Sequence, residues 1–128
     1  MKMENKSLFS GIHHSSLIVE DLEKALQFYC DILGLQKDPQ RPEMAYKGAW
    51  LNVGSQQIHL LNLNKTEQCV HQPEHVGRDR HTALHINDIS QLQNVLQAHK
   101  VPFTISSSGR QALFCRDPDG NGLEFIQL

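Results

Sequence analysis

The sequence is poor in cysteine, proline and glycine and has no long apolar run, and each shortage excludes a class of protein. Its three cysteines include no C-x-x-C pair, so we expect reduced thiols in a cytoplasmic protein and not a disulfide framework. Eight glycines and five prolines among 128 residues, with 39% hydrophobic residues, exclude collagen-like and disordered chains. No apolar segment approaches the roughly 20 residues of a membrane-spanning helix, so we expect no membrane partner.

Charge of one sign is also lacking, because 12 Lys and Arg residues face 14 Asp and Glu residues. The basic residues form no cluster, which argues against a nucleic-acid partner. A chain of this length suits a single domain, 1–128. One residue type is in excess: there are eight histidines, as many as Phe, Tyr and Trp together. Because imidazole binds metals and transfers protons near neutral pH, these histidines are the first candidates for a functional site.

The order of residues repeats once along the chain. Residues 12–22 resemble residues 79–89, and in both stretches a histidine precedes an aspartate by seven positions. A second similarity closes each half, where His59 and Glu124 each stand between apolar neighbours. Two halves of about equal length therefore carry the same order of parts, which indicates a duplicated structural unit.

Each half has the pattern of a strand, a helix and three further strands. Alternation of apolar and polar residues predicts a strand at 14–19, with His14 and Ser16 opposite the apolar side chains. Asp21 and Asp88 are suitable N-caps for the helices that follow. The extended runs after the helices are about 36–45, 46–53 and 57–63 in the first half, and about 101–106, 111–116 and 123–128 in the second.

We therefore expect an α+β fold made of two βαβββ modules, about 11–63 and about 80–128, joined by a linker of about 64–79. A helix should cover the outer face of each module, and the two modules should form a curved mixed sheet that encloses a cleft. Pseudo-twofold symmetry would then bring the inward residues of the opening and closing strands toward one point.

Three stretches resemble the vicinal oxygen chelate superfamily, which includes glyoxalase I, extradiol dioxygenases, fosfomycin-resistance thiol transferases, methylmalonyl-CoA epimerase and bleomycin-resistance proteins. They are 14–22, the F-Y-x-D-x-L-G-L of 28–35, and 114–125 with its D-P-D-G-N-x-x-E. The resemblance extends over about 12–126, and it implies paired βαβββ modules with one divalent metal ion in the cleft: Fe, Mn, Ni, Co or Zn. Imidazole and carboxylate ligands suit these metals.

In this resemblance the metal-ligand positions of the family fall on His14, His81 and Glu124. A fourth position, glutamate or glutamine in some members, falls on His59. With three ligands the set is two histidines and one carboxylate, as in non-haem Fe(II) oxygenases. With His59 added, it is closer to the four-ligand sites of glyoxalases and epimerases. The sequence leaves both sets open.

Other residues are candidates for contact with the substrate or for catalysis. Ser16 matches a hydroxyl near the first ligand of the fosfomycin-type transferases, and Arg110 borders the predicted cleft, where it would hold an anionic group. Glu124 and His85 are the candidate catalytic residues, and the His85 imidazole suits an acid or base. Bacterial glyoxalase I carries a glutathione-binding arginine at the position of Ile18, so the resemblance argues against glutathione as the substrate.

The remaining histidines are expected to have other roles. Strand parity places His13 on the helix-covered side, where it would pack in the core. Cys69, His71 and His75 could suggest a zinc site, but they lack a fourth spaced ligand and lie in the predicted linker.

Two functions follow from the sequence. The first is a metal-dependent enzyme, a lyase, isomerase or extradiol-type dioxygenase, whose small-molecule substrate chelates the metal through adjacent oxygens. The second is a metal-free protein that sequesters a small molecule or antibiotic, as bleomycin-resistance proteins do. Family members often dimerise, so we expect a homodimer. The sequence leaves open whether the cleft forms within one chain or between two.

Overall fold

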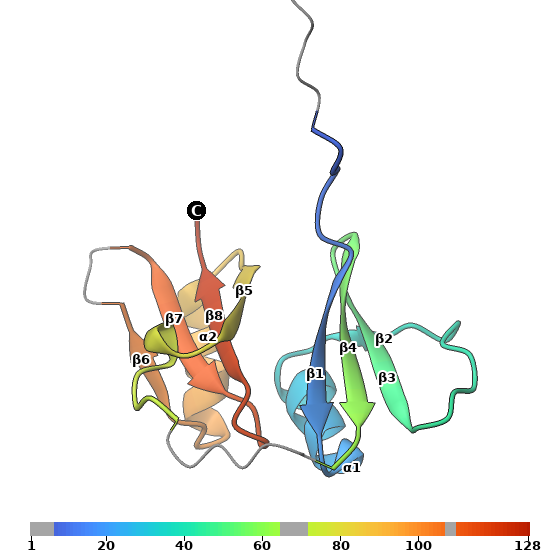
Figure 1. The fold of residues 1–128 in the computed structure, drawn as a ribbon. Coiled ribbons are helices and arrows are strands. Elements are labelled where there is room, and N and C mark those ends of the chain that lie inside the picture. Colours follow the sequence, from blue (N-terminus) through green and yellow to red (C-terminus); the bar gives the residue numbers. More distant parts are fainter. Residues whose placement is uncertain (1–6, 65–71, 107–109) are drawn as a thin grey trace, which may run out of the picture.

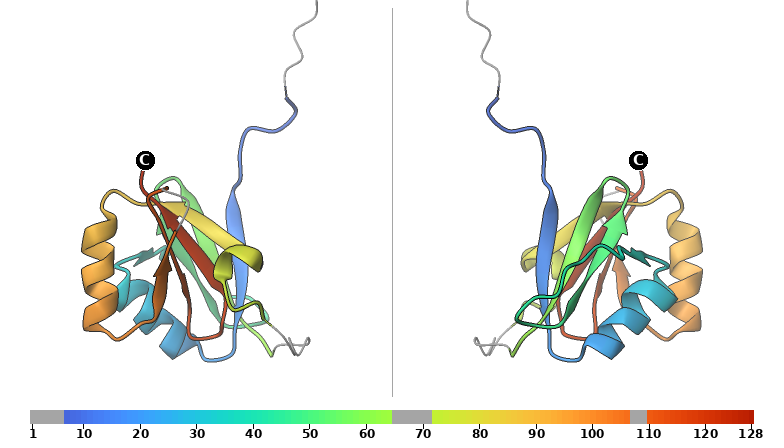
Figure 2. Two further views of the ribbon diagram at one scale, coloured as in Figure 1. Left: turned by 90° about the vertical axis from the view of Figure 1, so that its left-hand side faces the viewer. Right: turned by 90° about the vertical axis from the view of Figure 1, so that its right-hand side faces the viewer.

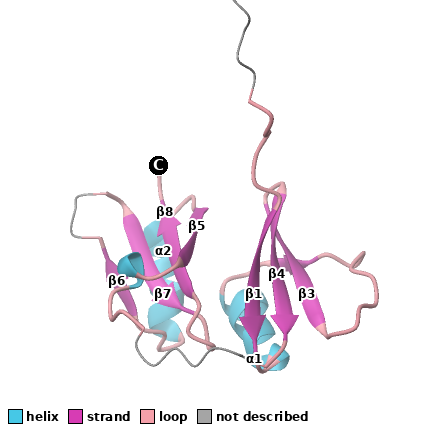
Figure 3. Ribbon diagram, viewed as in Figure 1, coloured by secondary structure: helices cyan, strands magenta, loops and turns pink. Residues whose placement is uncertain are grey.

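The computed structural model describes residues 7–64, 72–106 and 110–128 and places them in two four-stranded sheets with their helices (Figure 1). The first half comprises β1 (His14–Val19), α1 (Leu22–Leu26), the π-helix η1 (Gln27–Ile32), β2 (Gln36–Lys37), β3 (Gly48–Val53) and β4 (Gln56–Asn62). The second comprises the 3-10 helix η2 (Val76–Arg78), β5 (His81–His85), α2 (Ile89–Ala98), β6 (Phe103–Ile105), β7 (Ala112–Arg116) and β8 (Gly122–Ile126). The predicted α+β fold of two βαβββ units is confirmed (Figure 3).

The two sheets have the same topology. Their strand orders are β1-β4-β3-β2 and β5-β8-β7-β6, and in each the opening strand runs parallel to the closing strand while the other pairs are antiparallel. The α-helices α1 and α2 lie on one side of the molecule, behind the sheets in Figure 1 and toward one edge of each view in Figure 2. We call the opposite face of each sheet its uncovered face, because no α-helix of the described residues lies on it. On the second sheet the short helix η2 packs over part of this face, where Val76 clusters with Ala112 and Phe114. No helix among the described residues has the length and apolar character needed to cross a membrane.

The sheets stay separate, and their opening strands meet edge to edge. β1 and β5 are each the outermost strand of a sheet, and between them Ser15 Oγ lies 2.9 Å from Thr82 Oγ1. The Asn121 side chain, in the turn before β8, donates from Nδ2 to the Ile18 carbonyl oxygen at 3.0 Å. We call this line of contact between β1, β5 and the turn 117–121 the seam. The expectation that the sheets enclose a common cleft is therefore not met within one chain.

Local structure departs from the sequence prediction in two places. The extended run predicted at 36–45 shortens to the two residues of β2, because Pro39 and Pro42 cannot donate ladder hydrogen bonds. The first helix changes from α to π geometry after Leu26, so that the Leu33 N–H bonds the Phe28 carbonyl oxygen five residues back.

A buried carboxylate joins the two halves inside the core. The core contains residues from both helices and both sheets, and within it the Tyr29 hydroxyl donates to Asp117 Oδ2 at 2.7 Å. Asp117 also accepts from the backbone N–H groups of Asp119 and Asn121 and from the Asn121 side chain. Burial, and then the adjacent Asp117 carboxylate, raise the pKa of the Tyr29 hydroxyl far above its ordinary value, so that it remains a donor.

Removal of the Tyr29 hydroxyl tests this junction. We expect Tyr29→Phe to lower the free energy of unfolding by about 1–3 kcal/mol, because a donor to a buried carboxylate is lost. Tyr46→Phe is the matched control, since the Tyr46 ring lies against Arg41 outside the core and should change stability by less than about 0.5 kcal/mol. Urea unfolding at neutral pH measures both variants, and equal losses would contradict the role given to Asp117.

Candidate metal centre

The candidate ligands occupy equivalent positions in the two sheets. In the first sheet Ser16 of β1 pairs with His59 of β4, and in the second Ala83 of β5 pairs with Glu124 of β8. His14 lies two residues before Ser16 on β1, and His81 lies two residues before Ala83 on β5. Because side chains alternate along a strand, all of them lie on the face of their sheet opposite α1 and α2. The equivalence of His59 and Glu124 that the repeat predicts is confirmed.

His81 and Glu124 form a close pair in the second sheet. His81 Nε2 lies 3.0 Å from Glu124 Oε1, and Arg110 Nη2 lies 3.0 Å from the other carboxylate oxygen. The Glu124 side chain is only 8% exposed, whereas that of Arg110 is 61% exposed. The carboxylate is therefore held from both sides, and the cation on its outer side stays accessible to solvent.

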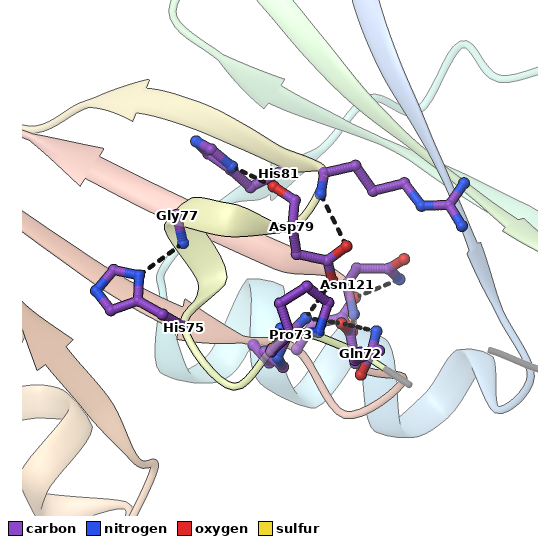
Figure 4. A network of polar contacts seen from close by, with 11 residues as sticks. Gln72, Pro73, His75, Gly77, Asp79, His81 and Asn121 are labelled. Carbon is purple, nitrogen blue, oxygen red and sulfur yellow. Dashed lines mark hydrogen bonds and ion pairs between the residues drawn. The ribbon is translucent and has the colours of Figure 1, made fainter. Parts of the chain in front are cut away.

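The protonation of His81 follows from its second contact. Its Nδ1 lies 2.8 Å from the backbone carbonyl oxygen of Asp79, which can only accept, so Nδ1 carries a hydrogen (Figure 4). Nε2 of the neutral ring then has a lone pair, and its close approach to Glu124 requires one further proton between the two. A divalent cation can replace that proton, because imidazole and carboxylate are both ligands for it. The donor set of this pair therefore fits a metal ion.

Asp79 is itself fixed by an arginine. Arg116 Nη1 donates to Asp79 Oδ2 at 2.9 Å and to the Gly120 carbonyl oxygen at 2.8 Å, and Nη2 donates to the Pro73 carbonyl oxygen at 2.7 Å. The hydrogen bond from Arg116 holds the pKa of the Asp79 carboxyl below its ordinary value, so that Asp79 stays charged at neutral pH. The network in Figure 4 thus joins the linker and the turn before β8 to the carbonyl that orients His81.

In the first sheet, His14 and His59 pack face to face. Their ring centroids are 3.8 Å apart and the ring planes are inclined by 14°. The His59 ring also stacks on Trp50, with centroids 4.6 Å apart and an angle of 10°. Since β4 lies between β1 and β3, His59 is the middle layer of three rings. Only 9% of His59 is exposed, whereas His14 is an exposed residue.

Hydrogen bonds also fix the His59 ring in its own plane. His59 Nε2 lies 2.8 Å from Gln57 Oε1, while Gln57 Nε2 donates to Asp38 Oδ2 at 2.9 Å and to Asn52 Oδ1 at 3.0 Å. Because a carboxylate only accepts, the Gln57 amide turns its oxygen toward His59, whose Nε2 therefore carries the hydrogen. Burial, and then the neighbouring His14, lower the pKa of His59, so that its ring is neutral near pH 7.

The structure does not bring the four candidate ligands to one point within a chain. One pair lies on each sheet, and in the described part of the chain no group of three or more His, Cys, Asp or Glu side chains is arranged to hold a metal ion. The physical reason is the seam: β1 and β5 meet at their edges, so the two uncovered faces lie side by side and do not face each other.

The structure places the other predicted site residues at two separate cavities. Ser16 and His81 line a cavity of about 570 Å³ along the seam. His85 lies four residues beyond His81 on β5, about 13 Å along the strand, where it borders a separate cavity lined largely by apolar side chains. Its action as an acid or base at the His81–Glu124 pair stays a prediction.

Of two histidines outside the predicted site, His13 contradicts its predicted location and His75 agrees with it. The prediction that His13 packs in the core is wrong: it is exposed, and its ring lies edge-on to His14, because it precedes β1 and strand parity does not apply to it. His75 lies in the linker as predicted and caps η2. Cys69 and His71 lie outside the described residues.

Sequence reasoning missed the residues that orient the histidines. Gln57 and Asp79 each stand two positions before a candidate ligand, so a polar residue at that spacing was a usable signal. Asp38 and Arg116 reach the site from distant parts of the sequence, and no local pattern points to them.

Comparison with known proteins places this geometry in a family. A sequence model of the Glyoxalase/Bleomycin resistance protein/Dioxygenase superfamily matches residues 11–125. The uncharacterized protein YaeR of Escherichia coli K12 is 31% identical over 127 residues, which cover 91% of this chain and 95% of that protein. Lactoylglutathione lyase of Haemophilus influenzae is 27% identical over 123 residues, which cover 91% of each chain.

A solved structure agrees with this at the level of the fold. The fosfomycin resistance protein FosX of Listeria monocytogenes was crystallised as a variant with Mn(II) and dihydroxypropylphosphonic acid. It aligns with a TM-score of 0.71 at 18% identity, covering 94% of this chain and 93% of that chain. The match of the family model over nearly the whole chain and the similarity to YaeR show that the chain belongs to the Glyoxalase/Bleomycin resistance protein/Dioxygenase superfamily.

Proposed function

We propose that this chain is a metal-dependent enzyme whose substrate is a small molecule with two adjacent oxygen atoms. The observation that carries the proposal is the His81–Glu124 pair, where a buried carboxylate and an oriented imidazole face a position that otherwise needs a proton. The Mn(II) bound by FosX supports a divalent metal ion among Fe, Mn, Ni, Co and Zn. The reaction proposed is of the lyase, isomerase or extradiol-dioxygenase type, and similarity to a lactoylglutathione lyase supports the first of these.

The contacts of each residue support a distinct role. The carbonyl of Asp79 holds His81 so that Nε2 faces the ligand position, and Arg110 holds the second oxygen of Glu124. When bound, a divalent ion supplies Lewis-acid chemistry to the substrate oxygens. The exposed guanidinium of Arg110 has further N–H groups, which suit an anionic group of the substrate. Ser16 offers a hydroxyl on the wall of the seam cavity.

We propose further that two copies of the chain complete the site as a homodimer, with His14 of one copy joining the His81–Glu124 pair of the other. The separation of the two pairs on side-by-side sheets supports this arrangement, because a second copy facing the seam would place one sheet of each chain opposite the other. Leu8 and Phe9 are 93% and 82% exposed on the segment that leaves the body of the molecule above β1, and such apolar residues favour association (Figure 1).

Metal uptake tests the first part of the proposal. We expect the metal-free protein to bind about one Mn²⁺ or Co²⁺ per chain in calorimetric titration. Glu124→Gln should weaken binding by more than about 100-fold, since loss of an outer partner of a ligand alone costs about 10- to 100-fold. Glu43→Gln, on the exposed loop between β2 and β3, is the control and should bind like the wild type.

The opposite result favours the second function. Uptake below about 0.2 ions per chain for each of the five metals would contradict a metalloenzyme and support a metal-free protein that sequesters a small molecule.

Mixing of two binding-deficient variants tests the shared site. His14→Ala removes a candidate ligand from the first sheet, and Glu124→Ala removes one from the second. In a heterodimer of the two variants, one shared site therefore keeps all of its ligands and the other lacks both His14 and Glu124. With random exchange of subunits, about one quarter of the wild-type metal capacity should return. His81→Ala mixed with Glu124→Ala is the matched control, because both changes fall in the same half and should restore nothing. No recovery in the first mixture would show that the ligands do not come from two chains.

A further inference from the structure

The two histidine-containing pairs present their ring atoms in different ways, although they stand at equivalent positions. In the second sheet a nitrogen of His81 points directly at a carboxylate oxygen of Glu124, 3.0 Å away. In the first sheet the rings of His14 and His59 lie face to face, with centroids 3.8 Å apart. Only the first of these arrangements aims two ligand atoms at a common point.

Stacked rings cannot share an ion in the arrangement observed. The lone pair of an imidazole nitrogen lies in the plane of its ring. Because the planes of His14 and His59 are inclined by only 14°, their lone pairs run in two nearly parallel layers. An ion within about 2.1 Å of a nitrogen on each ring would lie well out of both planes, where the lone pairs do not point.

Nε2, the nitrogen of His59 that lies furthest from the backbone, already takes part in a hydrogen bond. Its Nε2–H donates to Gln57 Oε1, and the Gln57 amide is itself tied to Asp38 and Asn52. Only Nδ1 is left with a lone pair, and Nδ1 is bonded to Cγ. The carboxylate oxygens of the equivalent Glu124 are bonded to Cδ and reach one bond further from their strand.

The surroundings of His59 also oppose a change of orientation. Its ring is enclosed between those of His14 and Trp50 and is 9% exposed. Rotation toward an ion would break both stacks and the hydrogen bond to Gln57. The same contacts suit a different task, because a fixed ring gives the exposed His14 ring a flat surface against which to lie.

We infer that His59 is not a metal ligand but a positioning residue that holds the His14 ring, so that the metal centre takes its ligands from His14, His81 and Glu124 alone. This inference rests on the proposed function. It chooses between the two ligand sets that the sequence leaves open. A set of two imidazoles and one carboxylate leaves more positions open than a four-ligand set, so a substrate that chelates through two oxygens can bind with a further small ligand beside it.

Nitrogen chemical shifts of the histidine rings test the assignment without any enzymatic assay. In ¹⁵N-labelled protein, His59 should show the tautomer with hydrogen on Nε2 before and after Zn²⁺ is added, with little change of its Nδ1 shift. The Nε2 signal of His81 and a ring-nitrogen signal of His14 should move on Zn²⁺ binding. A large shift of a His59 nitrogen would overturn the inference. If the wild type binds none of the five proposed metals, Zn²⁺ included, the proposed function itself is contradicted.

A pair of matched variants gives an independent measurement. His59→Phe keeps an aromatic ring between its neighbours but has no nitrogen, and we expect its Zn²⁺ dissociation constant to stay within about tenfold of the wild type. His14→Phe keeps a ring in the stack but removes the ligand, so it should weaken Zn²⁺ binding by more than about 100-fold. Circular dichroism establishes that both variants are folded. Equal losses in two folded variants would show that His59 is a ligand.

Discussion

The buried carboxylate of Asp117 connects the parts of the molecule on which the candidate site depends. It accepts hydrogen bonds from the Tyr29 hydroxyl on the helix side and from the turn that precedes β8. The same turn supplies a carbonyl to Arg116, which holds Asp79, whose own carbonyl orients His81. A carboxylate left without partners in this core would be strongly destabilising, so the turn, the helix and the histidine are positioned together.

The two halves share a backbone but differ in the chemistry built on it. Equivalent register positions hold His59 in one sheet and Glu124 in the other. Glu124 is held by the side chains of His81 and Arg110, whereas His59 is stacked between two aromatic rings and hydrogen-bonded to Gln57. In the site that we propose, the duplicated fold therefore provides a pair of ligands in one half and a rigid support for a single imidazole in the other.

The succession of strands and helix along each half and the shared face of the candidate ligands could be predicted from the sequence, because alternation and internal repetition are visible in the order of residues. The meeting of β1 and β5 at their edges could not, since Ser15 and Thr82 are separated by 67 positions and resemble ordinary strand residues. Which nitrogen of His81 carries the hydrogen could not be predicted either, because it depends on a hydrogen bond to a backbone carbonyl, a group that every residue has. His13 was misplaced because the start of a strand is less certain than its interior.

Placement of the two pairs on separate sheets has a thermodynamic consequence. If an ion takes ligands from two chains, metal binding and subunit association are linked, and each must strengthen the other by the same free energy. Dilution of the protein would then lower its apparent affinity for metal, and chelators would loosen the assembly. In such a protein the availability of metal would set the fraction of chains that are dimeric. Without metal the chain would be a monomer, with one part of the site on each of its two sheets.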